Sequence, residues 1–123
     1  MTGGIILFAH GSRIESANQA VRVVAEELSH SLGVPATAAF LELGQPDLEA
    51  AAAMMASRGI QRLVIVPYFL TLGLHMERDL PKLAERIILN NRDIDVRITA
   101  PLDGHPGLVR IVRDRALEAL IDT

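Results

Sequence analysis

Four short apolar runs alternate with four longer segments whose apolar residues recur at helical spacing. We expect strands at about residues 4–9, 36–41, 62–67 and 96–99. Strands that alternate with helices predict a parallel sheet covered by helices on both faces. The 123 residues suffice for one such domain, over residues 1–123. We therefore predict a single three-layer α/β domain with a four-stranded, mainly parallel sheet.

Residues that favour helix ends mark the predicted helices. Ser16 and Gln19 have the spacing of a capping box, and Gly33 should stop the first helix. Pro46 is expected in the first turn of the second helix. The third helix should follow a loop at 68–76, with Asp79 as a candidate N-cap. We expect the helices between about residues 16 and 33, 46 and 59, 79 and 89, and 108 and 121.

Composition excludes several classes of protein. The formal net charge of -3, without basic clusters, argues against nucleic acid as a partner. No apolar run is long enough to cross a bilayer, and the N-terminus does not resemble a signal peptide. Cysteine is absent, so disulfides and thiolate metal sites are excluded. We expect a cytoplasmic protein.

Histidine and acidic residues follow the predicted strands. His10 comes directly after the first strand, Glu42 after the second, and His75 in the segment that leaves the third. Right-handed crossovers put the carboxyl ends of parallel strands at one edge of the sheet, where open α/β sheets bind ligands. The four aromatic residues also lie at these strand ends. We therefore expect His10, Glu42 and His75 to converge there.

Two imidazoles and one carboxylate suit a borderline divalent ion such as Fe²⁺, Co²⁺, Ni²⁺ or Zn²⁺ and leave coordination positions open. Taken singly, each residue has an ordinary interpretation: a structural histidine at a strand end, a solvated carboxylate, and a capping or surface histidine. Asp79 is either a hydrogen-bond acceptor for His75 or a helix cap. His105 is a weaker candidate, and His30 is expected to be exposed near a helix end. Convergence at one edge favours the metal site.

Four motifs carry a resemblance to a known family. They are "HGSR" after the first strand, "FLE" after the second, "VPYFLTLGLHMERDLP" after the third and "PLDGHP" near the C-terminus, where "PLG-HP" is more usual. Together they resemble the class II metal chelatases of tetrapyrrole synthesis, and most closely the short-form sirohydrochlorin cobaltochelatases. The resemblance covers nearly the whole chain. It implies a chelatase-like fold of the flavodoxin or Rossmann type.

The resemblance implies insertion of a divalent metal into sirohydrochlorin or a related tetrapyrrole, a step toward cobalamin. The metal is a substrate, with Co²⁺ the first choice and Ni²⁺ or Fe²⁺ the alternatives, and no organic cofactor is expected. His10 is then a metal ligand and proton acceptor, His75 the second ligand, and Glu42 a ligand or proton relay. The histidine-rich insertion of many archaeal members has no counterpart here.

A flat, apolar macrocycle ringed by carboxylates needs an apolar wall and local cations. We expect the wall from Tyr68, Phe69, Leu70 and Leu72. Gly73 would permit close backbone approach. Arg13 and Arg78 are candidates to pair with the carboxylates, with Lys82 a weaker one. Ordinary surface charge is the alternative interpretation of all three cations.

Longer relatives look like two such modules in tandem, so the resemblance implies a homodimer. The segment 48–56 is apolar nearly all round, as expected either for a helix at a two-fold axis or for one buried within a subunit. Two other functions remain open. One is a non-catalytic divalent-metal carrier or sensor. The other is a histidine phosphatase, although Ala9 stands where those enzymes place an arginine before the histidine.

Overall fold

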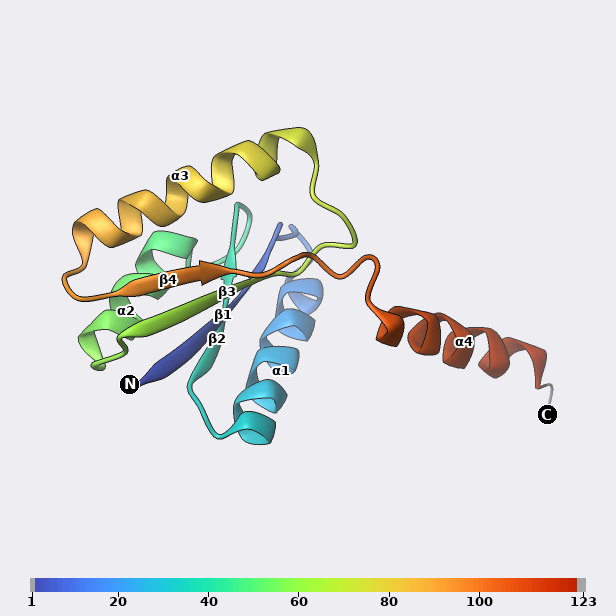
Figure 1. Cartoon of the computed structure of the whole chain (residues 1–123). Helices are drawn as coiled ribbons and strands as arrows, with labels where there is room; N and C mark the ends of the chain where they lie inside the picture. Colours follow the sequence, from blue (N-terminus) through green and yellow to red (C-terminus); the bar gives the residue numbers. More distant parts are fainter. Residues whose placement is uncertain (1, 122–123) are drawn as a thin grey trace.

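Four parallel strands form a sheet in the order β2-β1-β3-β4. The computed structural model describes residues 2–121 (Figure 1). The strands are β1 (Gly3–Ala9), β2 (Ala36–Phe40), β3 (Arg62–Pro67) and β4 (Asp95–Ile98). The helices are α1 (Glu15–Leu32), α2 (Leu48–Ser57), α3 (Leu74–Asn90) and α4 (Pro106–Leu120). The predicted α/β domain with a four-stranded parallel sheet is confirmed.

Strand β1 lies inside the sheet and pairs with β2 on one side and β3 on the other. Phe8 is opposite Ala39 of β2 and Pro67 of β3, so the three strands end almost level. All pairs are parallel, so the carboxyl ends share one edge. This is the edge at which the sequence predicts the functional residues.

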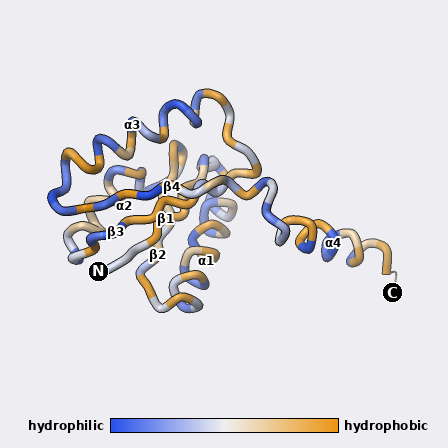
Figure 2. The backbone as a smooth tube through the Cα atoms, viewed as in Figure 1, coloured by the Kyte–Doolittle hydropathy of each residue, from blue (hydrophilic) through white to orange (hydrophobic). Residues whose placement is uncertain are grey.

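The sheet separates two apolar cores. Strands β1, β2 and β3 are apolar along most of their length, as expected for buried parallel strands, whereas the edge strand β4 alternates between polar and apolar residues (Figure 2). On one face Phe8 and Ile65 pack against residues of α2 and α3, such as Met55 and Leu80. On the other face Leu7 and Phe40 pack with residues of α1, such as Val21. Phe8 and Phe40 are fully buried, so both are core residues rather than site residues.

The predicted starts of α1 and α2 are wrong. Helix α1 begins at Glu15 after Ile14, without a side-chain cap, so Ser16 lies inside the helix and makes no capping box. Helix α2 begins at Leu48, and the Asp47 carboxylate caps it by accepting a hydrogen bond from the Ala50 N–H at 2.8 Å. Pro46 therefore precedes the cap, and its peptide bond to Gln45 is cis. In both cases, local sequence signals placed the helix start within about two residues.

Helix α3 begins earlier than predicted. It starts at Leu74, after Gly73, and contains Pro81. A proline inside a helix removes one hydrogen bond without forbidding the turns before it, and the Glu77 N–H already donates to the Gly73 carbonyl at 2.9 Å. Asp79 is therefore a helix residue and not the N-cap. His75 lies in the first turn of α3 rather than in a loop.

Helix α4 lies where the sequence predicts it but does not cover the sheet. It projects away from the other elements (Figure 1), and none of its residues 106–120, all of which the structure describes, is buried. The preceding linker is held elsewhere: the N–H groups of Leu102 and Asp103 donate to the carbonyls of Phe69 and Leu70. Helices α1, α2 and α3 thus form the cover. Within residues 2–121, no helix is long and apolar enough to cross a membrane.

The cap of α2 gives a direct stability test. Asp47→Ala removes the hydrogen bond to the Ala50 N–H and should lower the free energy of unfolding by about 1 kcal/mol. Ser16→Ala is the matched control, because the structure gives Ser16 no capping bond, and it should leave stability unchanged or slightly raised. Urea unfolding followed by circular dichroism measures both. A loss of stability with Ser16→Ala as large as that with Asp47→Ala would show that Ser16 caps α1.

Candidate functional site at the carboxyl edge of the sheet

Two loops touch where β1 and β2 end. Pairing continues beyond the strands, because the Leu41 N–H donates to the Ala9 carbonyl and the Glu42 N–H to the His10 carbonyl, at 2.9 and 3.0 Å. Gly11 then turns with φ of +96°. A Cβ atom at Gly11 would lie 1.7 Å from the Glu42 carbonyl oxygen, so only glycine fits. This close approach fixes the backbone beneath His10 and Glu42.

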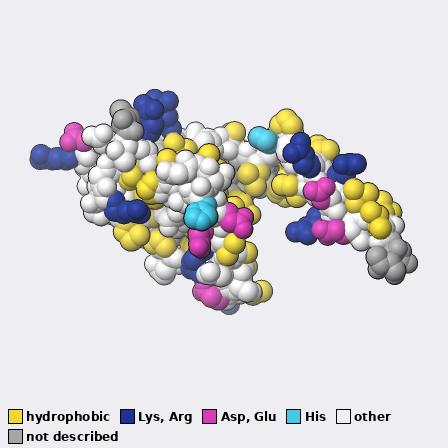
Figure 3. Space-filling view, turned by 90° about the horizontal axis from the view of Figure 1, so that it is seen from below, with side chains coloured by type: hydrophobic (Ala, Val, Ile, Leu, Met, Phe, Trp, Pro, Cys, Tyr) yellow, Lys and Arg dark blue, Asp and Glu magenta, His cyan; other side chains and the backbone are white. Residues whose placement is uncertain are grey.

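The side chains of His10 and Glu42 lie next to each other. His10 Nε2 is 3.4 Å from Glu42 Oε1, and His10 Nδ1 is 3.2 Å from the Gly11 carbonyl oxygen. The two side chains are 56% and 58% exposed. Figure 3 shows a histidine beside acidic side chains on the surface of the molecule. The pair is therefore open to an ion or ligand that arrives from solvent.

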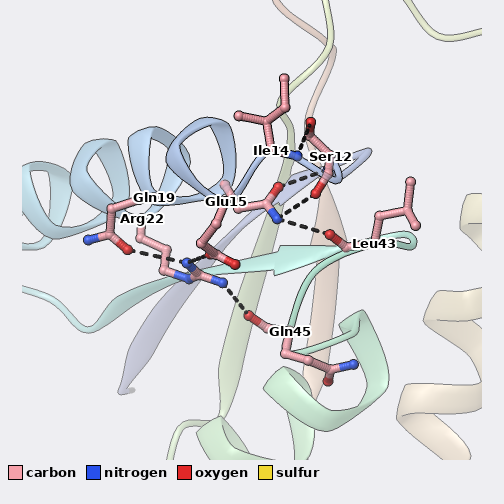
Figure 4. A network of polar contacts seen from close by, with 8 residues as sticks. Ser12, Ile14, Glu15, Gln19, Arg22, Leu43 and Gln45 are labelled. Carbon is pink, nitrogen blue, oxygen red and sulfur yellow. Dashed lines mark hydrogen bonds and ion pairs between the residues drawn. The ribbon is translucent and has the colours of Figure 1, made fainter.

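Asn18 joins the loops that carry this pair. Its Nδ2 donates to the carbonyl oxygens of Ser12 and Leu43 at 2.8 and 2.9 Å, and its Oδ1 accepts from the Ser12 N–H at 2.9 Å. The residue is 2% exposed and is the one buried polar residue among the described residues. Ser12 lies two residues after His10, and Leu43 directly follows Glu42 (Figure 4). Asn18 thus satisfies three part-buried main-chain groups of the two loops.

A second contact between α1 and the β2–α2 loop lies farther from the site. Arg22 donates to the Gln45 carbonyl oxygen at 3.0 Å and pairs with Glu15 (Figure 4). Its guanidinium lies 5.2 Å from the centre of the Phe40 ring. Arg22 is partly exposed, so each polar contact contributes little on its own. Together with Asn18 it fixes the loop on the first turns of α1.

His75 lies on helix α3 and not on the loops that carry His10 and Glu42. Its helix face, by spacing, includes Asp79, Lys82 and Arg86. These three residues line a hollow of about 260 Å³ together with Leu41, the neighbour of Glu42. No hydrogen bond joins His75 to Asp79 among the described contacts. The structure therefore brings His10 and Glu42 together, and among the described contacts His75 has no ion pair or hydrogen bond with either.

The His10–Glu42 pair alone does not supply the three side chains of a typical metal site. Within residues 2–121, no three His, Asp or Glu side chains lie close enough to hold one ion. One imidazole and one carboxylate still offer two good donors to a borderline divalent ion. The remaining coordination positions stay open to a ligand or to a further side chain. Such a site suits an ion that is bound briefly and passed on, rather than one that is kept.

Tyr68 and Phe69, the aromatic residues of the predicted apolar wall, lie apart. Tyr68 packs beside the core under α1, and Phe69 packs edge-on against Phe8 in the other core, with ring centres 6.2 Å apart. The two rings therefore lie on opposite faces of the sheet and do not form one surface. Leu70 is 62% exposed at the rim. Gly73 is exposed and precedes the first residue of α3.

The cations and the other histidines have distinct surroundings. Arg13 and Arg78 are exposed, and neither takes part in the ion pairs found among the described residues. Lys82, the weaker candidate, lines the hollow beside Leu41. His105 caps α4, because its Nδ1 accepts from the Gly107 N–H at 2.8 Å. His30 is exposed in the last turn of α1.

Asn18 and Gly11 are the site residues that sequence analysis missed. Asn18 lies at helical spacing with Val21 and Ala25, which are buried, so a polar amide stands on the apolar stripe of α1. That mismatch was the available signal, because a buried amide needs partners. Gly11 gave no comparable signal, since any turn after a strand favours glycine. Its contact with Glu42 depends on the pairing of β1 with β2.

Replacing Asn18 should loosen the His10–Glu42 pair. Asn18→Ala leaves part-buried main-chain groups unpaired, and we expect a loss of about 1–3 kcal/mol in the free energy of unfolding. In the folded variant, affinity for Co²⁺ should fall about tenfold, as for other residues that orient metal ligands. Calorimetric titration at a temperature where both proteins are folded measures this affinity.

Gln19→Ala is the matched control, because it removes an amide from the adjacent, exposed position of α1. It should change stability by less than about 0.5 kcal/mol and leave Co²⁺ affinity unchanged. Equal Co²⁺ affinity in folded Asn18→Ala and in the unsubstituted protein would show that Asn18 contributes to stability but not to metal binding.

Known proteins are similar to this chain in sequence along nearly its whole length. The chain is 32% identical over 118 residues to sirohydrochlorin ferrochelatase, chloroplastic, from Arabidopsis thaliana, with 95% of this chain and 52% of that protein covered. It is 31% identical over 138 residues to sirohydrochlorin cobaltochelatase from Methanopyrus kandleri, with 94% and 96% covered. It thus spans about half of the first relative and nearly all of the second.

A solved structure agrees with the sequence match. A CbiX protein of cobalamin (vitamin B12) biosynthesis from Marinobacter aquaeolei superimposes with a TM-score of 0.84 at 30% sequence identity, with 96% of this chain and 97% of that one covered. The sequence model of the CbiX family matches residues 4–119, from the first strand to the end of α4. This chain, with its histidine–carboxylate pair at the carboxyl edge of a four-stranded parallel sheet, belongs to the CbiX family.

Proposed function

We propose that this protein inserts a divalent metal into sirohydrochlorin, with Co²⁺ as the preferred ion. The observation that carries the proposal is the His10–Glu42 pair, held at 3.4 Å by fixed loops and half-exposed at the sheet edge where α/β proteins bind ligands. Relatives named as sirohydrochlorin cobaltochelatase and ferrochelatase support it. We further infer a cytoplasmic protein that acts in cobalamin biosynthesis.

The reaction needs a donor of metal and an acceptor of protons. One M²⁺ enters the macrocycle, and the two pyrrole N–H groups release two protons. A neutral imidazole at His10 is suited to bind the ion or to accept a proton, and a carboxylate at Glu42 is suited to pass protons to solvent. Both are exposed, so the protons have a short way out. Two or three ligands also leave the ion free to move to four ring nitrogens.

His75 is the proposed second imidazole. Its support is the spacing along α3, which puts it on the helix face of Asp79, Lys82 and Arg86, three residues that line the hollow beside Leu41. The hollow of about 260 Å³ is smaller than the roughly 300–1,000 Å³ of typical ligand pockets. The macrocycle must therefore lie over the rim rather than inside an enclosed pocket. In that position it would lie between His75 and the His10–Glu42 pair.

Exposed groups around the rim are suited to the edges of the macrocycle. Arg13 follows the His10 loop, and Arg78 lies one turn after His75 on α3; neither is engaged in an ion pair among the described residues. Both are available for peripheral carboxylates. Leu70 and Gly73 border the rim between β3 and α3, and Tyr68 and Phe69 support that loop from the two faces. We also propose that the protein acts as a homodimer.

Variants of the pair test the activity. Purified protein is mixed with sirohydrochlorin and Co²⁺, and the absorption spectrum of the macrocycle is followed. His10→Ala should slow enzyme-dependent insertion about 100-fold or more, because it removes both a ligand and a proton acceptor. Glu42→Gln and His75→Ala should each slow insertion at least tenfold.

His30→Ala is the matched control, since His30 is an exposed histidine in the last turn of α1. Its rate should equal that of the unsubstituted protein. Tight Co²⁺ binding without acceleration of insertion would favour the metal carrier or sensor. Hydrolysis of a phosphomonoester that His10→Ala abolishes would favour the histidine phosphatase.

Competition between metals tests the preference for Co²⁺. Nitrogen and oxygen ligands bind Ni²⁺ more tightly than Co²⁺, and Co²⁺ more tightly than Fe²⁺. A site that must release its ion should therefore pass Co²⁺ on faster than Ni²⁺, while holding it better than Fe²⁺. At equal buffered free concentrations and without oxygen, we expect the highest insertion rate with Co²⁺. Faster insertion of Fe²⁺ or Ni²⁺ would assign the preference to that ion.

A further inference from the structure

Leu43, the residue that follows Glu42, has a backbone conformation that is unfavourable for leucine. Its φ of +56° lies in the left-handed region. Among the described residues, the only other non-glycine residue with a positive φ is Asp93, and aspartate tolerates this conformation better than leucine does. The Leu43 side chain is also 49% exposed, so half of its surface gains nothing from the core. Leucine is therefore costly at this position in two ways.

Ile14, in the loop after β1, is unfavourable for a different reason. It is the N-cap of α1 and makes no side-chain capping bond. Serine, threonine, aspartate and asparagine are preferred at an N-cap, because their side-chain oxygen accepts a hydrogen bond from the first turn. Isoleucine leaves that bond unmade, and its side chain is 66% exposed. Each of the two loops that carry His10 and Glu42 thus contains an exposed aliphatic residue where the backbone favours another residue type.

Hydrogen bonds beneath the pair hold both residues in place. Asn18 Nδ2 donates to the carbonyl oxygens of Ser12 and Leu43, at 2.8 and 2.9 Å. The Ser12 hydroxyl oxygen accepts from the Ile14 N–H at 3.0 Å. Because one nitrogen atom binds both carbonyl oxygens, the two loops lie side by side. In Figure 4 the side chains of Ile14 and Leu43 both point away from these hydrogen bonds, to the same side of the loops.

Exposure alone does not mark a functional residue, because single exposed apolar side chains are ordinary on protein surfaces. Ile14 and Leu43 differ, since serine at 14 and asparagine at 43 would favour the same backbone and leave no apolar group in solvent. Residues that break a local preference persist at functional sites, where the surrounding structure offsets their cost. What these two residues add beside His10 and Glu42 is apolar surface, which neither an imidazole nor a carboxylate supplies.

We propose that Ile14 and Leu43 form the apolar contact for one face of the macrocycle beside the His10–Glu42 pair. The inference rests on the proposed function and deepens it, because it names the residues that hold a flat, apolar substrate. Release of water from the two side chains favours binding. The loops that carry the contact also carry the pair, so a macrocycle bound there lies next to His10. This contact takes the place of a wall built from Tyr68 and Phe69, which lie on opposite faces of the sheet.

Variants that suit the backbone but lack the apolar side chain test the contact. Leu43→Asn introduces a residue that tolerates a positive φ, and Ile14→Ser introduces a capping hydroxyl. Each should leave the thermal midpoint of unfolding unchanged or raise it by about 2–5 °C, as followed by circular dichroism. Each should nevertheless weaken binding of metal-free sirohydrochlorin about tenfold, because apolar contact is lost. Titration followed by the absorption spectrum of the macrocycle measures this affinity.

Affinity for Co²⁺ separates a contact with the macrocycle from support of the loops. Both variants keep the main-chain groups that Asn18 and Ser12 bind, so Co²⁺ affinity should stay within about twofold of that of the unsubstituted protein. Leu32→Asn is the matched control, because Leu32 is 57% exposed at the opposite end of α1 from Ile14. It should leave the affinity for the macrocycle unchanged.

Three results would overturn the contact. One is an unsubstituted protein that does not bind metal-free sirohydrochlorin. Another is binding by Leu43→Asn and Ile14→Ser as tight as that of the unsubstituted protein. The third is a joint loss of Co²⁺ and macrocycle affinity in variants with a lowered midpoint, which would make both residues supports of the loops.

The insertion assay is a separate measurement, so the two proposals can fail independently. A protein that binds the macrocycle through Ile14 and Leu43 but does not accelerate metal insertion would refute the proposed activity and leave the contact intact. A protein that inserts metal while both variants bind the macrocycle normally would refute the contact alone.

Discussion

The parallel pairing of β1 with both β2 and β3 is the constraint on which the site depends. It puts Ala9, Phe40 and Pro67 at one edge and makes the chain leave the sheet there three times. Pairing continues one step past the strands, so the loop after β1 rests directly on Glu42. Gly11 is the residue that permits this contact. A side chain there would separate His10 from Glu42.

A buried amide makes the edge rigid where the site is most open. His10 and Glu42 are more than half exposed, so packing cannot hold them. Their backbone is instead held by the buried Asn18 side chain of α1, which is hydrogen-bonded to the main chain of Ser12 and Leu43. An exposed pair on a fixed backbone suits transfer of an ion. Solvent keeps both side chains accessible, while the hydrogen bonds of Asn18 hold the loops that carry them.

Helices α1, α2 and α3 pack on the sheet, whereas α4 does not. Three helices bury the core around β1, and the Asp47 cap and the Asn18 bonds fix the loops between them. Helix α4 is bound to none of this, yet the linker before it is tied to Phe69 and Leu70 of the β3–α3 loop. The linker thus joins the start of α4 to the loop that precedes His75.

The sequence by itself determined the strands, the parallel sheet and the edge at which His10 and Glu42 meet. These follow from apolar periodicity and from the handedness of crossovers, which act locally or apply to every such sheet. Tertiary structure decided the rest. The helix starts, the partners of Asn18 and the separation of Tyr68 from Phe69 depend on contacts between distant segments, which periodicity does not record. The course of α4 is the clearest case, because its helical pattern fixes an apolar stripe but not the surface that the stripe covers.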